Sequence, residues 1–240
     1  MESLSYISHF FKPSWNCPVC GSQDFIFNKV LWKELVGDWE LSECEAAYID
    51  RQQGLSCQQC QNNLRSMALA EGILSYLGSN ETLQKTARRF KYRNLKVLEI
   101  NSAGNLTPFL KGLRNHTLIN YPESNIMKLQ FDDGIWDLVI HSDTLEHVPD
   151  PMLGLRETQR LLRNGGASVF TVPIIVNRMS RTRDDLKPSY HGDPANPLDD
   201  YKVFTEFGVD VWTSVLEAGF QSCRFHHLDY PAGIAIEAVK

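Results

Sequence analysis

The segment from Trp136 to Pro151, WDLVIHSDTLEHVPDP, constrains the fold of this chain more than any other part of the sequence. It opens with a short apolar run, Leu138 to Ile140, that is typical of a buried parallel strand, and it continues into several ionisable side chains. Pro149 and Pro151 then mark the start of a new helix, because proline is favoured in the first helical turn. A buried strand that opens into polar residues ahead of a helix indicates the ligand-binding edge of an α/β sheet.

A strand, an acidic residue, the phrase LEHVPDP, an amphipathic helix, the phrase LLRNGG and a further strand follow one another in this region. This order resembles the second half of a class I S-adenosylmethionine-dependent methyltransferase. Within that family it is most similar to the type 11-like branch that methylates small molecules, which includes the ubiquinone-biosynthesis O-methyltransferases. The resemblance implies an α/β fold with a doubly wound, Rossmann-like sheet, mostly parallel with an antiparallel last strand, and it implies S-adenosylmethionine as cofactor. The competing interpretation is an ordinary strand-to-helix loop that collects polar residues.

The 240 residues, 42% of them hydrophobic, suffice for one ordinary domain and a small appendage. We expect a zinc-ribbon-like module over 1–62, linking helices over 63–93 and the methyltransferase domain over 94–240. No stretch has the length and apolarity of a membrane span, and the N-terminus does not resemble a signal peptide, so the expected location is cytoplasmic. A net charge of -5 argues against a protein that binds nucleic acid without sequence preference, because such a protein needs a basic surface.

Four of the six cysteines form two identical pairs, CPVC at Cys17 and Cys20 and CQQC at Cys57 and Cys60. Each pair lets two thiolates approach one cation from a tight turn, and two pairs complete the tetrahedral sulfur shell of a structural Zn²⁺. Four thiolates leave no open position, so we expect no catalytic role for this metal. Reduced structural thiols, a disulfide framework and a redox dithiol are the alternatives.

The 36 residues between the two cysteine pairs exceed the usual zinc-ribbon spacing. The segments FIFNKVLW and LVGDWEL are therefore predicted to add strands or an insertion between the pairs. After Cys60, apolar residues recur at helical spacing in NNLRSMALAEGILSYLG, which predicts a core-packing helix that Gly78 can end. The charged ETLQKTARRFKYRN is predicted to be a solvated helix and loop.

A compact strand, LKVLEI, is followed by the loop NSAGNL at the position of the family's glycine-rich loop. The family pattern E-x-G-x-G is kept in part, since Glu99 and Gly104 are present while Asn101 and Ala103 stand where glycine is usual. The resemblance implies that Glu99 supports the loop and that the Gly104 backbone lies beside the methionine part of the cofactor. Asn101 and Ser102 are expected nearby by position. An ordinary strand-to-helix turn is the alternative.

The next strand, HTLINYP, is expected to end beside the ribose, where Asn120 and Glu123 are candidates to bind its hydroxyl groups. The usual helix and third strand between the ribose and adenine positions are predicted to be shortened or missing. Asn125 is a candidate for adenine recognition, and Ser142, at the end of the strand that begins at Trp136, is a further cofactor candidate.

For a hydroxyl acceptor, His147 is the first candidate for a catalytic base, with Glu146 or Asp143 close enough in sequence to orient it. His191, in the segment SYHGDP, is the second candidate. The alternatives are that Glu146 and His147 are structural, or that Asp143, Glu146 and His147 together bind a divalent cation.

The long polar segment IIVNRMSRTRDDLKPSYHGDPANP follows the strand GASVFTVP, in the place where related enzymes build the acceptor site. Its Arg178, Arg181 and Arg183 are predicted to clamp an anion or to pair with Asp184 and Asp185. A helix around FGVDVWTSVLEAGF and two final strands then resemble the closing antiparallel pair of the family.

The sequence therefore predicts methyl transfer from S-adenosylmethionine to a small molecule or saccharide precursor, at oxygen. An RNA methyltransferase is one alternative, because some of these enzymes carry N-terminal zinc modules. A non-catalytic binding or scaffold protein is another, because the cofactor loop departs from the family pattern.

Overall fold

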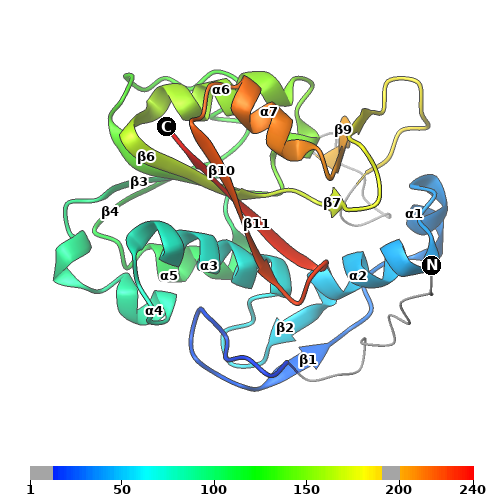
Figure 1. Ribbon diagram of the computed structural model, residues 1–240, viewed down its shortest axis with the longest axis horizontal. Coiled ribbons are helices and arrows are strands. Elements are labelled where there is room, and N and C mark those ends of the chain that lie inside the picture. The colour runs from blue at the N-terminus through cyan, green and yellow to red at the C-terminus, as the bar shows by residue number, and fades with distance from the viewer. Residues whose placement is uncertain (1–12, 191–200) are drawn as a thin grey trace.

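A six-stranded sheet forms the centre of the computed structural model, which describes residues 13–190 and 201–240 (Figure 1). The strand order is β10-β11-β6-β5-β3-β4, with parallel pairing from β4 to β6 and antiparallel pairing of β11 with both β6 and β10. Its strands are β3 (Lys96–Ile100), β4 (Asn115–Ile119), β5 (Trp136–Ser142), β6 (Leu162–Thr171), β10 (Ser222–Leu228) and β11 (Gly233–Val239). The predicted mostly parallel sheet with an antiparallel end is confirmed.

The middle strand β5 is buried along almost its whole length, because it lies between β3 and β6 and is covered on both faces. Leu138 pairs in register with Val97 of β3 and Ala167 of β6, and all three side chains are fully buried. A continuous apolar run suits a central parallel strand for this reason. The carboxyl ends of β3, β4, β5 and β6 meet at one edge of the sheet, and the polar residues that follow them are brought together there.

Helices cover both faces of the sheet (Figure 1). One face carries α6 (Pro151–Leu161) and α7 (Val211–Glu217), and the other carries α3 (Leu64–Leu77), α4 (Leu83–Thr86) and α5 (Thr107–Leu110). The predicted core-packing helix is α3, which ends at Gly78 in the left-handed conformation. A Cβ atom on Gly72 of this helix would lie 2.7 Å from the Val169 side chain of β6, so glycine permits the close approach of helix and sheet.

Residues 120–135, all of which the structure describes, contain no helix or strand, so β4 is an edge strand. This agrees with the prediction that the usual helix and third strand are shortened or missing. The site at this edge is therefore closed by turns rather than by a regular element.

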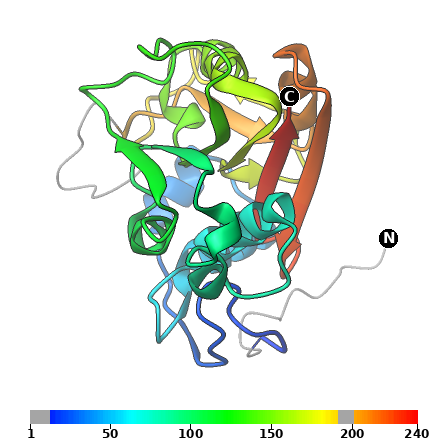
Figure 2. The same cartoon turned by 90° about the vertical axis from the view of Figure 1, so that its left-hand side faces the viewer.

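The N-terminal part pairs β1 (Phe25–Phe27) with β2 (Leu55–Cys57) and inserts α1 (Lys33–Asp38) and α2 (Glu43–Gly54) between them. The two segments predicted to add strands or an insertion do so in different ways, since FIFNKVLW contains β1, whereas LVGDWEL includes the end of α1 and belongs to a helical insertion. A capping box explains the helical start that follows it: the Ser42 hydroxyl accepts from the Glu45 N–H, and the Glu45 carboxylate accepts from the Ser42 N–H. The β1–β2 ribbon lies below the central sheet in both views (Figure 1 and Figure 2).

A small sheet of order β7-β9-β8 completes the fold, with β7 (Ile174–Ile175), β8 (Arg181–Thr182) and β9 (Thr205–Gly208). Among the helices that the structure describes, none has the length and apolarity needed to cross a lipid bilayer.

Candidate functional site

A cleft of about 600 Å³ opens at the carboxyl edge of the sheet. Its walls come from the residues after β3, β4 and β5 and from the segment around Tyr201 and Phe204. Of the residues predicted from the sequence to contact cofactor or acceptor, the cleft lining contains Asn101, Ser102, Asn125, Ser142, Asp143 and His147. The topology thus gathers residues that are up to 46 positions apart in the sequence (Asn101 to His147).

Glu99, at the penultimate position of β3, holds the loop that follows the strand. Its side chain is fully buried and accepts from the Ala103 N–H at 2.8 Å and from the Thr107 hydroxyl at 2.5 Å. Its second oxygen lies 2.6 Å from Nε2 of His116. Glu99 is not part of the cleft lining, so it supports the loop from behind.

The departures from the glycine pattern do not distort the loop. Asn101 adopts a φ of +58°, a left-handed conformation that asparagine tolerates better than most residues. Its side-chain oxygen accepts from the Tyr121 N–H at 2.8 Å, so the loop is tied to the end of β4. Ala103 has a φ of -77° and needs no glycine, and Gly104, at φ +60°, has nothing within 4 Å of the position of a Cβ atom. The loop therefore keeps a shape that leaves its backbone accessible to a ligand.

The two residues expected to bind ribose differ in their placement. The Asn120 side-chain oxygen accepts from the Ser102 N–H at 3.1 Å and braces the loop. Glu123 is exposed in a turn and is not part of the cleft lining. Asn125 lines the cleft, and its side-chain oxygen accepts from the Met127 N–H at 2.9 Å. Ser142 lines it too, with its hydroxyl 2.9 Å from that of Thr171.

Sequence reasoning missed three aromatic residues of the cleft, Tyr121, Tyr201 and Phe204, of which the two tyrosines are 50% and 41% exposed. Tyr121 follows Asn120 directly, so its place after β4 was a signal that could have identified it. Tyr201 is brought to the cleft from a segment distant in sequence, and no local pattern marks it.

Asp143 directly follows β5 at a φ of +44°. Its carboxylate forms an ion pair with the Arg65 guanidinium of α3 and accepts from the Thr171 hydroxyl at 3.4 Å. His147 lies in the same cleft, 3.0 Å from its Nδ1 to the Lys202 carbonyl oxygen. A carbonyl only accepts, so Nδ1 carries the proton and the lone pair is on Nε2. Burial lowers the pKa of His147, so the ring is neutral at neutral pH.

Glu146 is 1% exposed, and neither carboxyl oxygen has a hydrogen-bond partner within the described part of the chain. Burial, followed by the Asp143 charge, raises its pKa well above the usual value, which favours the uncharged carboxyl group. Its Oε1 lies 3.7 Å from Nε2 of His147. Among residues 13–190 and 201–240, the donor atoms of Asp143, Glu146 and His147 do not gather as a metal site. The second candidate base, His191, lies outside the described residues.

The three arginines of the acceptor-site segment are engaged within the protein. Arg178 binds the Glu45 carboxylate of α2 through two contacts of 3.0 Å. Arg181 and Arg183 both pair with Glu206 of β9. The predicted pairing with Asp184 or Asp185 is therefore wrong, and clamping a ligand anion would require breaking these pairs. Their observed partners fix residues 178–183 against α2 and β9.

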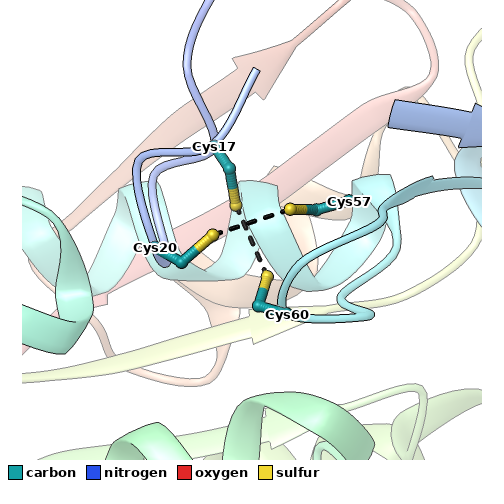
Figure 3. Close-up of side chains that lie close together, drawn as sticks. All are labelled: Cys17, Cys20, Cys57 and Cys60. Carbon is teal, nitrogen blue, oxygen red and sulfur yellow. Dashed lines mark hydrogen bonds between the residues drawn. The ribbon is translucent and has the colours of Figure 1, made fainter. Parts of the chain in front are cut away.

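The four cysteines of the two CxxC pairs lie together, although 37 positions or more separate the partners across the pairs (Figure 3). The sulfur atoms of Cys17 and Cys60 are 3.6 Å apart, as are those of Cys20 and Cys57, and all four lie within 4.8 Å of one another. Four sulfurs bound tetrahedrally at the zinc–sulfur distance would be about 3.8 Å apart. The cluster therefore fits a Zn²⁺ ion.

Both CxxC turns have the same backbone form. The residue after the second cysteine is left-handed in each, with φ +89° at Gly21 and +58° at Gln61. Its N–H donates to the carbonyl of the first cysteine, at 2.7 Å and 2.9 Å respectively. A hydrogen bond from Cys17 lowers the pKa of Cys60 to about 5, so a thiolate is present at neutral pH.

The cysteine turns are bonded directly to the sheet domain. Asn62, after the second turn, donates to the Asn105 carbonyl at 3.2 Å, and Asn105 donates from its side chain to the Gln61 carbonyl at 2.8 Å. Asn105 belongs to the 3-10 turn Gly104–Leu106 that follows the cofactor loop. These hydrogen bonds hold the second cysteine turn against the segment that follows the cofactor loop.

Residues 77–170 match the family model described as "Methyltransferase domain". A 57-residue stretch, 24% of this chain, is 40% identical to a sarcosine/dimethylglycine N-methyltransferase of Halorhodospira halochloris, and the match spans 20% of that relative's length. A possible histamine N-methyltransferase structure from Thermotoga maritima is 18% identical, with a TM-score of 0.38 over 60% of this chain and 82% of that one. A 1,6-didemethyltoxoflavin-N1-methyltransferase structure from Burkholderia thailandensis is 16% identical, with a TM-score of 0.40 over 72% and 87%.

The sheet order and the cleft at its carboxyl edge accompany a match of residues 77–170 to a methyltransferase domain family. This match agrees with the class I S-adenosylmethionine-dependent methyltransferase domain that the sequence predicted.

Proposed function

We propose that this protein transfers a methyl group from S-adenosylmethionine to an oxygen atom of a small molecule. The observation that carries the proposal is the 600 Å³ cleft at the carboxyl edge of the sheet, within a region that matches a methyltransferase family. Open α/β sheets bind their ligands at this edge. The cleft has the volume of a small-molecule site and combines polar side chains with Ile126 and Met127.

Asn101, Ser102, Asn125 and Ser142 are the residues that we propose to hold the cofactor, because their side chains line the cleft. The exposed backbone at Gly104 allows a ligand to approach the loop closely. Tyr121 and Tyr201 offer flat apolar surfaces to a nucleoside base. Glu99 and Asn120 act indirectly, because their hydrogen bonds fix the loop rather than face the cleft.

When bound, the cofactor supplies a methyl group whose bond to sulfur breaks, with the electron pair left on sulfur, as a bond to the acceptor oxygen forms. The acceptor's hydroxyl proton would pass to Nε2 of His147, which is neutral and lines the cleft. The Lys202 carbonyl holds the ring in the tautomer that this role needs. Asp143 would position the acceptor, and the raised pKa of Glu146 disfavours a second negative charge beside it.

The cysteine cluster is proposed to hold a structural Zn²⁺. Its support is the gathering of four sulfur atoms within 4.8 Å, at the end of two turns of the same form. The ion would supply no chemistry to the reaction, since four thiolates complete its coordination shell.

Titration calorimetry with S-adenosylmethionine and with its demethylated product tests the cofactor site. Both are expected to bind the unmodified chain, and Asn125→Ala is expected to weaken binding by about tenfold through loss of a cleft contact. Asn115→Ala is the matched control, because Asn115 is exposed at the opposite end of β4 and donates to the Arg93 carbonyl. If neither compound produces heat on titration, the result would support a non-catalytic scaffold protein instead. Tight, salt-sensitive binding of RNA would support an RNA methyltransferase.

A further inference from the structure

A second cavity, of about 350 Å³, adjoins the cleft. Its walls come from the segment between the two cysteine pairs, which includes the loop before α1, α1 itself and α2, together with Arg65 of α3 and the ends of β5 and β6. Eight of its eleven lining residues are apolar, including Trp32 and Trp39. This cavity therefore differs in chemistry from the polar cleft.

Asp143 lines both the cleft and the second cavity. The two spaces meet at this carboxylate, which stands at the carboxyl end of β5. A molecule in the second cavity with a polar group at Asp143 would present that group toward a cofactor in the cleft. The proximity of donor and acceptor that methyl transfer requires is thus available at this point.

The polar wall of the second cavity has one buried donor without an acceptor. Arg65 pairs with Asp143 and donates to Gln53 Oε1 at 3.0 Å, but its Nε–H is buried and has no acceptor within the described residues. A buried donor left in this way costs free energy, which an oxygen atom of a ligand would recover. A ligand oxygen beside Arg65 also gains from the positive charge when it ionises.

The walls of the cavity are fixed by hydrogen bonds from outside it. The Asp50 carboxylate of α2 accepts from the N–H groups of Val30 and Leu31, at 2.6 Å and 2.8 Å. The indole N–H of Trp39 donates to the Ser189 hydroxyl at 2.7 Å. A cavity held open in this way is preformed, as small-molecule sites commonly are.

We infer that the second cavity is the methyl-acceptor site and that it takes a hydroxylated aromatic ring, with the ring against Trp32 and the oxygen at Arg65 and Asp143. This inference rests on the proposed function and narrows its acceptor. A saccharide fits less well, because each of its many hydroxyl groups needs a partner, and the polar groups among the side chains that line this cavity are few: Gln53, Arg65, Asp143 and the indole N–H groups of Trp32 and Trp39, the latter already bonded to Ser189. Gln53 Oε1 already accepts from both Asn63 and Arg65.

Titration calorimetry with 2-naphthol, on the 240-residue chain loaded with zinc, tests the site without turnover. Trp32→Ala is expected to weaken binding by about tenfold or more, because a stacked aromatic surface is lost. Trp212→Ala is the matched control, since Trp212 is 46% exposed on α7 and is not part of the cavity lining. Trp32→Phe, which keeps a ring and disturbs packing least, is expected to retain most of the affinity.

The ionisation of bound 2-naphthol provides a second readout, because its absorption changes when its hydroxyl group loses a proton. The pKa of a free phenol such as tyrosine is about 10. The Asp143 carboxylate also faces this oxygen and opposes its ionisation, so the test compares variants that all keep Asp143. The pKa of bound 2-naphthol is expected to be about one unit or more higher in Arg65→Gln than in the unmodified protein, and to lie between these two values in Arg65→Lys, because only lysine keeps the charge.

Equal affinity of the Trp32→Ala and unmodified proteins for 2-naphthol would overturn the inference. So would tighter binding of methyl glucoside than of 2-naphthol, or displacement of 2-naphthol by S-adenosylhomocysteine, which would place the ring in the cleft. Titration of the same samples with S-adenosylhomocysteine separates this inference from the proposed function. Binding of 2-naphthol without binding of S-adenosylhomocysteine would overturn the methyltransferase proposal and the acceptor role, while tryptophan-dependent binding would still define an aromatic site.

Discussion

The cleft and the second cavity share Asp143 but are built in different ways. The cleft is formed mainly by loops that follow β3, β4 and β5. The lining residues that were predicted from the sequence are mainly polar. The second cavity is formed mainly by the segment between the cysteine pairs and is mostly apolar. The sheet topology thus provides the cleft, whereas an insertion between the two CxxC turns provides the second cavity. With the roles proposed above, donor and acceptor recognition can vary independently.

The largest effect is expected from removing the cysteine cluster, whose two turns flank in sequence the segment that walls the second cavity and whose second turn is bonded to the segment after the cofactor loop. Replacing Cys17 and Cys57 by serine is expected to reduce zinc content from about one ion per chain to none. The free energy of unfolding should fall by several kcal/mol, on the order of 5, because metal binding is coupled to folding. Metal analysis and denaturant unfolding measure these changes.

Cys44→Ser and Cys223→Ser are the controls, because neither residue belongs to the cluster. If the variant with both Cys17 and Cys57 replaced kept one zinc ion per chain, the proposed metal site would be rejected. The proposal that a bound metal holds the insertion that forms the second cavity would be rejected with it.

The second largest effect concerns chemistry at the junction of the two spaces. His147→Asn is expected to lower turnover by about a hundredfold, in the range usual for a general base, while binding of S-adenosylmethionine and of 2-naphthol changes little. Burial lowers the pKa of His147, so turnover should be retained at neutral pH and be lost as the pH falls below the usual histidine value. Steady-state rates as a function of pH provide the measurement, and unaltered turnover would remove His147 from the mechanism.

A third prediction concerns the sheet side alone. His141 of β5 is fully buried, stacks on Phe170 with ring centres 4.7 Å apart, and has its pKa lowered to about 3 by burial. In the unfolded chain this histidine binds a proton near pH 6.5, whereas in the folded chain it stays unprotonated until the pH approaches about 3. The free energy of unfolding should therefore fall as the pH falls from about 6.5 toward 3.

His141→Phe removes the titrating group and keeps a ring, so it should reduce this loss of stability by a few kcal/mol, on the order of 3. Denaturant unfolding at several pH values measures the difference. An unchanged pH dependence would show that other groups govern acid stability.

The smallest effect is expected at the hydrogen bonds between the second CxxC turn and the segment that follows the cofactor loop. Asn105→Ala removes the hydrogen bond to the Gln61 carbonyl and should weaken binding of S-adenosylmethionine by about fivefold, corresponding to about 1 kcal/mol. Binding of 2-naphthol should be unchanged, because Asn105 is not part of the second cavity. Calorimetry with both compounds tests this, and equal weakening of both would mean that the two sites do not vary independently.

The sequence by itself determined the features that depend on neighbours along the chain. The apolar run of β5 and the helical spacing of α3 are local, so residue type and spacing predict them. The residues that gather in the cleft were largely predictable for a related reason, since the ends of parallel strands meet at one edge.

Only the tertiary structure decided what depends on contacts between distant segments. Arg178 pairs with Glu45 across 133 positions, and Arg65 pairs with Asp143 across 78, whereas the sequence suggested partners for Arg178 a few residues away. The second cavity exists because α1 and α2 pack over the ends of β5 and β6, and no periodicity in the sequence encodes that packing. Local patterns fix the backbone of each element, but ion pairs and cavities follow from how the elements lie against one another.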